Sequence, residues 1–528
     1  MSAAAVTPGK RYDAIIIGAG HNGLVCASYL ARAGRSVLVL EAQGAVGGAA
    51  TTREFAQGFS VSAGAHLLHM MPRALQQDLK LASHGLEYAA SGLPTVALAA
   101  DGRPLGVGPS ALPALAERSA RDAAAYGPFS ARLGRFARFL HTLQDAAPPR
   151  LGTDAFGDRL ALAKVGLRLR LLGRRDMREF LRIIGMNAYD LLSDEFETPL
   201  LKGALGLDAV LGTNFGPRAP GTVLTYLSRL AAESAVGPLP LAQPRGGLGA
   251  VSQALARAAT AAGATIRTSA PVARIVVRED RAAGVELGSG ERIEAAAVIS
   301  NADAKTTFLR LLGARHLDTG FVRKVDHLRS HGLAAKLHLA LDRLPAFQGV
   351  PPAALGGRLV LAPSLDYLER AWNHSKYGEC SAAPAIEITL PTVHDPALAP
   401  AGKHVLSAVV QYAPYAPRAG WQAERARFTD SVLGTLEAHA PGIRALVTAV
   451  ELLTPADLER EFGMTGGHWH HGELAFDQFY MVRPVPGAAQ YRTPLAGLYL
   501  CGASSHPGGG VMGLAGRNAA RALLKGAT

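Results

Sequence analysis

The sequence predicts an α/β protein in which one domain is assembled from separated stretches of the chain. Two observations predict this class. Residues 12–41 read as an apolar strand, a glycine turn, an alanine-rich helix, a second strand and an acid, which is the order of a nucleotide-binding βαβ unit. Residues 497–524 read as a strand, a glycine loop and a helix. We therefore expect a discontinuous Rossmann-like domain with an inserted domain of mixed sheet plus helices.

The first turn carries the spacing G-x-G-x-x-G at Gly18, Gly20 and Gly23. In such a turn the first glycine permits a tight bend, the second lets the backbone approach a pyrophosphate, and the third permits close helix packing. The phosphates would lie at the N-terminus of the helix that begins near Asn22. Glu41 ends the second strand, where a carboxylate accepts hydrogen bonds from ribose hydroxyls.

The middle of the chain changes pattern. From about residue 110 to 240 it is helical, with arginine and leucine stretches broken by glycine and proline. Residues 245–264 predict a further helix, and alternation in 334–341, 385–390 and 404–412 predicts strands of a mostly antiparallel sheet.

Composition limits the class of protein. The chain has 528 residues, more than one ordinary domain. Its net charge of +12 comes from scattered arginines without a recognisable nucleic-acid module, so nucleic acid is not an expected partner. Three dispersed cysteines indicate a reducing compartment rather than disulfides. The first ten residues lack a signal-peptide stretch, and no apolar run approaches the roughly twenty residues of a membrane span. We expect a cytoplasmic protein, either free or peripheral on a membrane; its oligomeric state stays open.

The closing segment repeats the glycine spacing at Gly508, Gly510 and Gly513. Only fifteen residues follow Gly513, which leaves no room for the next strand and its ribose-binding acid. We interpret the helix N-terminus near Val511 and Met512 as addressing another part of the first cofactor, where its dipole would stabilise a reduced, anionic flavin ring. A simple glycine-rich turn is the alternative.

Further glycines at 47 and 48 also favour a flavin cofactor, because FAD is longer than NAD and needs more backbone near its phosphates. The segments IIIGAGHNGLVCASYLARAG, LEAQGAVGGAATT and LYLCGASSHPGGGVMGLAGRNAA resemble the FAD-binding segments of phytoene desaturase-type oxidoreductases. Within them they are most similar to the phytoene dehydrogenase-related branch of pyridine nucleotide-disulfide oxidoreductase domain proteins. PRGGLGAVSQALA, VISNADA and GGHWHHGELAFDQFYMVRP extend the resemblance, whereas about 110–240 matches poorly.

The resemblance implies FAD and a set of residues that contact it. The ADP half would be bound by Gly18, Gly20, Gly23 and Glu41, the pyrophosphate and ribityl region by Gly47, Gly48, Ala49 and Gly502, and the isoalloxazine by Gly510, Val511 and Met512. Val272 resembles the residue whose backbone contacts adenine, or it is a plain strand residue.

We expect residues 1–110, 241–315 and 480–528 to form the FAD-binding domain, and residues 111–240 and 316–479 to form the substrate domain. The implied reaction is FAD-dependent removal of a hydride and a proton from an apolar substrate, with carbon–carbon desaturation of an isoprenoid or acyl-like molecule favoured. A flavin amine oxidase, a redox-neutral polyene isomerase and a membrane-associated flavoprotein scaffold without turnover are alternatives. Because no second dinucleotide fingerprint lies in the middle of the chain, oxygen or a quinone is the expected electron acceptor.

Two groups of residues are catalytic candidates. His471 and Glu473 belong to a histidine-rich stretch from His468 to Asp477 and could act as general bases. Neighbouring residues at these spacings would not converge on one ion, so no metal site is expected. The alternative is a polar loop under the flavin, satisfied by its own hydrogen bonds.

Lys336 stands in the alternation AAKLHLAL. It resembles the lysine that related amine-oxidising flavoproteins place near the flavin N5 through a water, although a solvent-facing lysine is the preferred interpretation. His66, which follows the first glycine segments, is a weaker candidate of the same kind.

Residues 164–182 hold seven basic and two acidic residues interleaved with leucines. Such a stretch suits a peripheral membrane contact, since arginines bind lipid phosphates and leucines enter the acyl boundary. A surface helix with a solvated basic face is the alternative.

Overall fold

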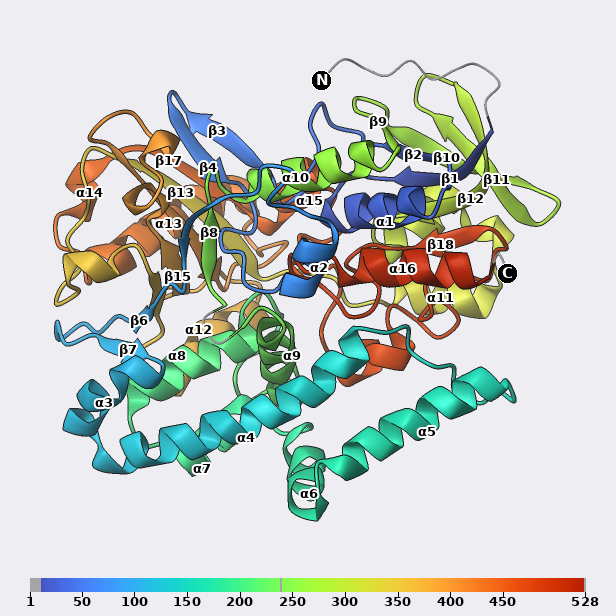
Figure 1. Ribbon diagram of the computed structural model, residues 1–528. Helices are drawn as coiled ribbons and strands as arrows, with labels where there is room; N and C mark the ends of the chain where they lie inside the picture. The colour runs from blue at the N-terminus through green and yellow to red at the C-terminus, as the bar shows by residue number, and fades with distance from the viewer. Residues whose placement is uncertain (1–10, 238–239, 527–528) are drawn as a thin grey trace.

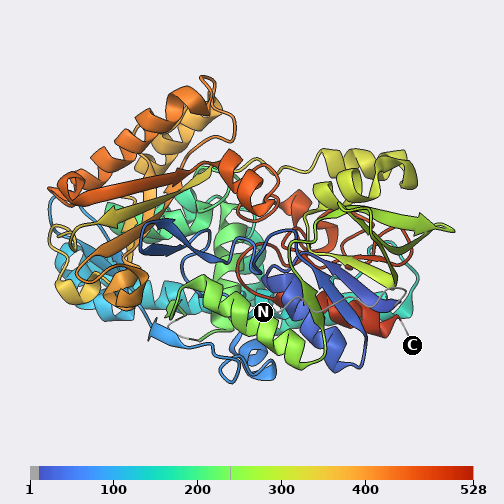
Figure 2. The same cartoon turned by 90° about the horizontal axis from the view of Figure 1, so that it is seen from above.

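The computed structural model describes residues 11–237 and 240–526. Two large sheets form separate lobes, one at each end of the molecule, and a layer of helices runs beneath them (Figures 1 and 2). The predicted α/β class is confirmed. The first ten residues, for which no signal peptide is expected, lie outside the described part.

The nucleotide-binding lobe is built on a sheet with the order β10-β11-β12-β1-β2-β9, in which β18 also pairs with β12. Parallel pairing joins β1 to β2 and β12, β2 to β9, and β12 to β18, whereas β10, β11 and β12 pair antiparallel. The strands are β1 (Tyr12–Ile17), β2 (Val37–Leu40), β9 (Thr265–Arg267), β10 (Val272–Arg278), β11 (Arg281–Leu287), β12 (Arg292–Ser300) and β18 (Leu498–Leu500).

Three helices from distant parts of the sequence pack beside this sheet: α1 (His21–Arg32), α10 (Leu248–Ala261) and α16 (Leu514–Lys525). The crossing of α1 and α16 is close because position 516 is a glycine. A Cβ there would lie 2.0 Å from the carbonyl oxygen of Asn22. The two ends of the chain are thus held together in one core, as the discontinuous domain requires.

The second lobe has a sheet with the order β17-β13-β16-β15-β14-β6-β7. Its central strands are antiparallel, as predicted for the alternating segments. The strands are β6 (Thr95–Ala97), β7 (Leu105–Val107), β13 (Ala334–Leu341), β14 (Arg358–Leu361), β15 (Ala385–Thr389), β16 (His404–Gln411) and β17 (Val447–Leu453). Helix α13 (Trp421–Glu437) packs on this sheet through Phe428, Val432 and Leu436.

Two details differ from the expected division of the chain. Strands β6 and β7 fall inside the segment 1–110, yet they pair with each other and with β14 of the second sheet. Helix α11 (Thr319–Asp326) falls in the segment 316–479, yet Phe321 and Val325 pack into the core of the nucleotide-binding sheet. The two strands and the helix are short, so their apolar side chains do not show from the sequence which core they join.

The predicted helical region is confirmed by α3 (Leu112–Arg118), α4 (Ala120–Gln144), α5 (Phe156–Leu171), α6 (Arg174–Ile183), α7 (Ala188–Glu195), α8 (Pro199–Val210) and α9 (Thr222–Ser234). Long helix α4 packs against α9 and buries Phe129, Leu133 and Phe136. Helix α5 lies along the lower edge of the molecule, beyond α4 (Figure 1).

The remaining helices and strands lie between the lobes or at their edges. They are α2 (Arg73–Asp78), α12 (Leu365–Lys376), α14 (Ile443–Leu446), α15 (Pro455–Phe462) and the small strands β3 (Thr52–Ala56), β4 (Phe59–Ser62), β5 (Tyr88–Ser91) and β8 (Ala242–Pro244). Among the helices of the described ranges, none is both long enough and apolar enough to cross a bilayer.

Candidate active site

The glycine turn between β1 and α1 is a cradle with no room for side chains. Gly18 has φ of +93°, and a Cβ on Gly23 would lie 2.3 Å from the Gly18 carbonyl oxygen. A Cβ on Gly20 would lie 2.8 Å from Nδ2 of Asn301, which follows β12. Helix α1 begins directly after Gly20 without a side-chain cap. Its first backbone N–H groups are therefore free to bind phosphate.

Glu41 lies at the end of β2 and is buried. Its carboxylate accepts hydrogen bonds from the backbone N–H groups of Ala19, at 2.7 Å, and Gln43, at 2.9 Å. The N–H of Ala270 donates to the Glu41 carbonyl at 2.8 Å, which brings the start of β10, and so Val272, beside the same strand end. The expected ribose and adenine ligands thus share one edge of the sheet.

The second and third glycine segments close around the first. The N–H of Gly47 donates to the Ala19 carbonyl at 2.9 Å, and a Cβ on Gly502 would lie 2.4 Å from the Asn301 carbonyl oxygen. Gly510 has φ of +113°, and α16 begins at Leu514. The helix therefore begins slightly later than the predicted position near 511–512, and Gly513 caps it.

These segments enclose a cavity of about 160 Å³. Its wall is mostly apolar, and it includes the expected flavin-contacting residues Ala49, Gly510, Val511 and Met512. The rest of the wall comes from both lobes and from α4, α8 and α9; it includes His66, Gln144, Leu211, Thr225, Val409, Leu458, Trp469 and Pro507. Segments separated by more than 400 residues therefore share one chamber.

Several polar atoms around this chamber are buried without a partner in the described structure. They are Nε2 of His21, Oδ1 of Asn22, Nδ1 of His470, Nδ1 of His471 and Oγ of Ser504. Such atoms cost free energy unless a ligand or water satisfies them. Together with the glycine cradle, they fit a bound dinucleotide whose redox ring extends into the cavity.

Lys336, on β13, is fully buried, so the solvent-facing interpretation is wrong. Its Nζ donates to Nδ1 of His66 at 2.7 Å, and the opposite ring nitrogen of His66 donates to Glu387 at 2.9 Å. Strand β13 lies between β16 and β17 with both faces covered. An alternating pattern in such a strand does not mark a wet face.

Burial sets the protonation of these groups. It lowers the pKa of Lys336 well below 10.5, because a desolvated ammonium is disfavoured. It also lowers the pKa of His66 to about 4, with the nearby Lys336 acting in the same direction. At neutral pH His66 is therefore uncharged, with Nδ1 as acceptor and Nε2–H as donor.

A chain of ion pairs continues from Glu387 along the cavity wall. Arg358 binds both Glu387 and Asp208, and Arg229 bridges Asp208, at 3.2 Å, and Glu233, at 3.0 Å. Glu233 in turn contacts His69 at 2.7 Å. Burial opposes the charged form of Glu387, but the Arg358 guanidinium, the hydrogen bond from His66 and the charge of Arg229 together hold its pKa well below 4.5. This network was not predicted; its sequence signal is a single charge in each of the apolar segments GRLVL and AIEIT.

The two other catalytic candidates are placed differently. His471 lines the cavity and has φ of +51°, and burial lowers its pKa to about 4. Glu473 does not line the cavity; it accepts from the backbone N–H of Asn214 at 2.9 Å and contacts Nε2 of His468 at 3.3 Å. The structure thus brings His471 to the cofactor cavity and leaves Glu473 in the supporting loop.

Arg483 anchors that loop and was missed from the sequence. Its guanidinium is fully buried and donates to the backbone carbonyls of His470 at 2.7 Å, Glu473 at 3.0 Å and Ala503 at 3.1 Å, among others. One cation therefore fixes the histidine stretch against the C-terminal glycine loop. An arginine followed by proline carries no sequence signal of this role.

Comparisons with known proteins agree with this geometry. A family model described as flavin containing amine oxidoreductase matches residues 23–524. The chain is 36% identical over 545 residues to pyridine nucleotide-disulfide oxidoreductase domain-containing protein 2 of Rattus norvegicus, covering 97% of this chain and 93% of the relative. It is 25% identical over 527 residues to the lycopene-forming phytoene desaturase of Pseudescherichia vulneris, covering 97% and 98%.

Among solved structures, putrescine oxidase bound to putrescine aligns with a TM-score of 0.62 and 17% identity, covering 98% of this chain and all of that one. At this identity the likeness shows the fold alone. The resemblance expected from the sequence motifs is confirmed, and the cofactor that fits the cradle and cavity is FAD.

Proposed function

Because the chain belongs to the family of flavin containing amine oxidoreductases and is an FAD-dependent oxidoreductase, we propose that it desaturates a carbon–carbon bond of an apolar, isoprenoid or acyl-like substrate. Bound FAD supplies the hydride acceptor. The similarity to a lycopene-forming phytoene desaturase supports this substrate class. The observation that carries the proposal is the cavity wall, which is mostly apolar and in which the carboxylates are already paired.

The pairing of those carboxylates bears on the amine oxidase alternative. Glu387 and Asp208 line the cavity, but each is held by an arginine. An ammonium substrate would have to compete with a fixed guanidinium for either of them. The wall is therefore better suited to an apolar substrate than to a cation.

Lys336 is the proposed holder of the substrate proton. Burial holds its pKa well below 10.5, which favours the neutral amine, the form able to accept a proton. His66 lies between Lys336 and the cavity, and the bond to Glu387 fixes the orientation of its ring. Once Lys336 is protonated, the carboxylate of Glu387 stabilises the new charge.

Replacement of Lys336 tests this role. In the holoenzyme, Lys336→Met should lower the rate of anaerobic flavin reduction about a hundredfold while FAD stays bound, because methionine fills similar space without a basic atom. In the native enzyme that rate should fall as the pH drops through the lowered pKa of Lys336, and this limb should vanish in the variant. Lys403→Met, which removes a surface lysine paired with Asp342, is the matched control and should change neither. An unchanged pH profile in Lys336→Met would refute the assignment.

A substrate panel tests the reaction itself. Long isoprenoid hydrocarbons and acyl thioesters should bleach the flavin anaerobically. Peroxide formation with amines alone would assign an amine oxidase. Polyene isomerisation without net flavin reduction would assign an isomerase, and bound FAD that no substrate bleaches would assign a scaffold; each of these outcomes overturns the proposal.

Two further parts of the proposal concern partners. Oxygen or a quinone is the proposed acceptor of the electrons. The chain is also proposed to contact a membrane peripherally through the basic stretch 164–182, since an apolar substrate partitions into lipid.

A further inference from the structure

Helix α5 is exposed in an unusual way, because it carries apolar stripes on two opposite sides. The inner stripe includes Val165 and Leu169, which pack against the core beneath α4. The outer stripe leaves large apolar side chains in solvent: Phe156 (79% exposed), Leu160 (43%), Leu167 (59%) and Leu171 (74%). At about 100° per residue, these four positions fall within roughly 60° of the helix circumference. The outer stripe is therefore continuous and has no partner in the described chain.

Basic side chains flank the outer stripe on both sides. Arg159 and Arg170 lie along one border, and Lys164 and Arg168 lie along the other; all four residues are exposed. The acidic residue of this helix, Asp158, points to the inner side and binds Arg150 at 2.9 Å. The outer face of α5, defined as these four apolar and four basic residues, thus combines an apolar strip with cationic borders.

We infer that the outer face of α5 is a membrane-binding surface for a bilayer that contains anionic lipids. The apolar strip would enter the acyl boundary while the cations contact lipid phosphates. A second copy of this chain fits poorly, because pairing two such faces would bring the arginine borders together. This surface overlaps the proposed stretch 164–182 and extends it toward the N-terminus as far as Phe156, the first residue of α5.

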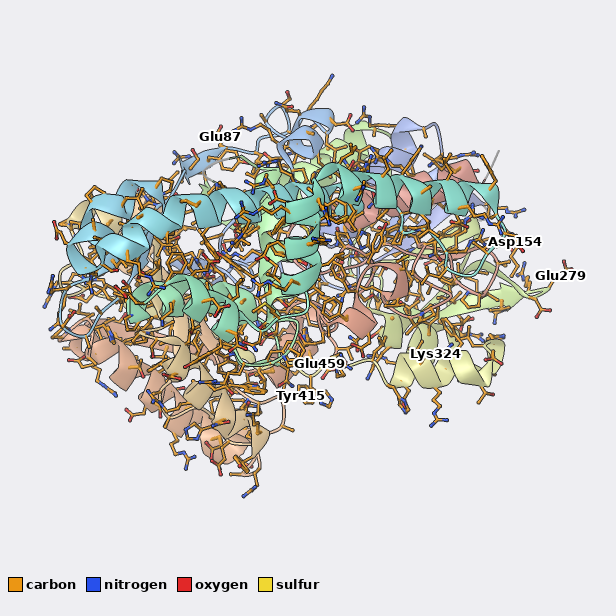
Figure 3. All side chains as sticks on the ribbon, turned by 90° about the horizontal axis from the view of Figure 1, so that it is seen from below. Glu87, Asp154, Glu279, Lys324, Tyr415 and Glu459 are labelled. Carbon is orange, nitrogen blue, oxygen red and sulfur yellow. The ribbon has the colours of Figure 1, made fainter. Side chains whose placement is uncertain are left out.

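The position of α5 supports this orientation. Figure 1 shows the helix along the lower edge, and Figure 3 shows it across the face nearest the viewer, with Asp154, just before its first residue, labelled at one end. Leu151, upstream of the helix, is also exposed, at 60%.

One border of this surface lies within electrostatic range of a residue that packs next to the cavity wall. Burial raises the pKa of Tyr480 to about 12, and nearby Arg168 opposes that shift. The Tyr480 ring packs against His506 at 5.2 Å, and the next residue, Pro507, lines the cavity. The delivery of a lipid-soluble substrate along this side depends on the proposed desaturation, whereas binding of the outer face of α5 to lipid can be tested without any substrate.

Vesicle binding of the FAD-loaded full chain tests the inference without any substrate. The chain should co-sediment with vesicles of phosphatidylcholine and phosphatidylserine, more weakly with phosphatidylcholine alone, and less as salt rises. The variant F156S/L167S/L171S should bind at least about tenfold more weakly. Tyr377→Ser, which removes another exposed aromatic, 65% exposed directly after α12, should bind like the native chain. Retained FAD absorbance shows that each variant is folded.

A second probe reports the depth of insertion. Trp introduced as Phe156→Trp should shift its emission to the blue with anionic vesicles. Equal sedimentation of the triple variant and the native chain would overturn the inference. It would also be overturned if the native chain formed a dimer that the triple variant abolished, since the face would then be a contact between copies. Turnover of substrate dispersed in detergent, measured separately, tests the reaction alone.

Discussion

At the scale of single residues, the cofactor site depends on glycines, because a Cβ atom at these positions would have no space. The turn after β1 approaches Asn301 and its own backbone so closely that a methyl group at Gly20 or Gly23 has no space. Its free N–H groups would bind the pyrophosphate of FAD. At Lys336 and His66 the side chains themselves matter, because burial in a covered sheet lowers the pKa of both groups.

Gly23→Ala should therefore abolish FAD binding, because the new Cβ would meet the Gly18 carbonyl oxygen at 2.3 Å and widen the cradle. The FAD content of the purified protein, read from its visible absorbance, measures this. The matched control is Gly157→Ala on α5, where an added Cβ meets nothing within 4 Å; that variant should keep its FAD. Equal FAD content in the two variants would show that the cradle tolerates a side chain.

At the scale of elements, a buried cation joins the second sheet to the helical layer. Arg358 lies on β14 and binds Glu387 on β15 and Asp208 on α8. Although burial opposes the charged form, these carboxylates raise the pKa of Arg358 above 12.5. Breaking a buried pair costs more than forming it gains, because the remaining charge stays desolvated.

Arg358→Met should lower the free energy of unfolding by about 3–5 kcal/mol. The double variant R358M/E387Q should recover part of this loss, since it removes one of the stranded charges. Arg274→Met breaks an exposed pair with Glu286 across β10 and β11 and should leave the free energy of unfolding nearly unchanged, because water already solvates both charges. Urea unfolding of the four proteins measures these differences; equal costs for Arg358→Met and Arg274→Met would contradict the role of the buried pair.

At the scale of the whole molecule, several histidines in or next to the cavity are uncharged at neutral pH. Burial is the main cause that lowers the pKa of five of them from 6.5 to about 4: His21, His66, His470, His471 and His506. Each binds a proton more readily in the unfolded chain than in the folded one. Their stabilisation is therefore complete above pH 6.5 and is lost as pH falls toward 4.

The free energy of unfolding should accordingly decline between pH 6.5 and 4, with each of these histidines contributing up to about 1.4 kcal/mol per pH unit. Urea titrations at a series of pH values, at constant ionic strength and with FAD bound, measure the slope. Replacing His506 by Gln, which also keeps a group able to donate to the Leu143 carbonyl, should reduce it. A flat profile over this range would mean that the histidines are not buried as described.

The sequence by itself determined the parts of the protein that depend on neighbouring residues. The glycine spacing and the strand, turn and helix order in 12–41 identify the cradle, and the C-terminal glycine loop identifies flavin, because backbone geometry there permits few residue types. The alternating strands of the second sheet were predicted for the same reason, since side-chain direction follows a period of two.

Only the tertiary structure decided what long-range packing controls. Alternation suggested solvent for Lys336, but β13 is covered on both faces, so the lysine is buried beside His66. The ion pairs of Arg358 and the anchoring by Arg483 join residues separated by up to 150 positions. The fold also decides which stripe of α5 is exposed, because the inner stripe packs against the core and the outer stripe does not. Local sequence fixes which way a side chain points; the fold decides what it meets there.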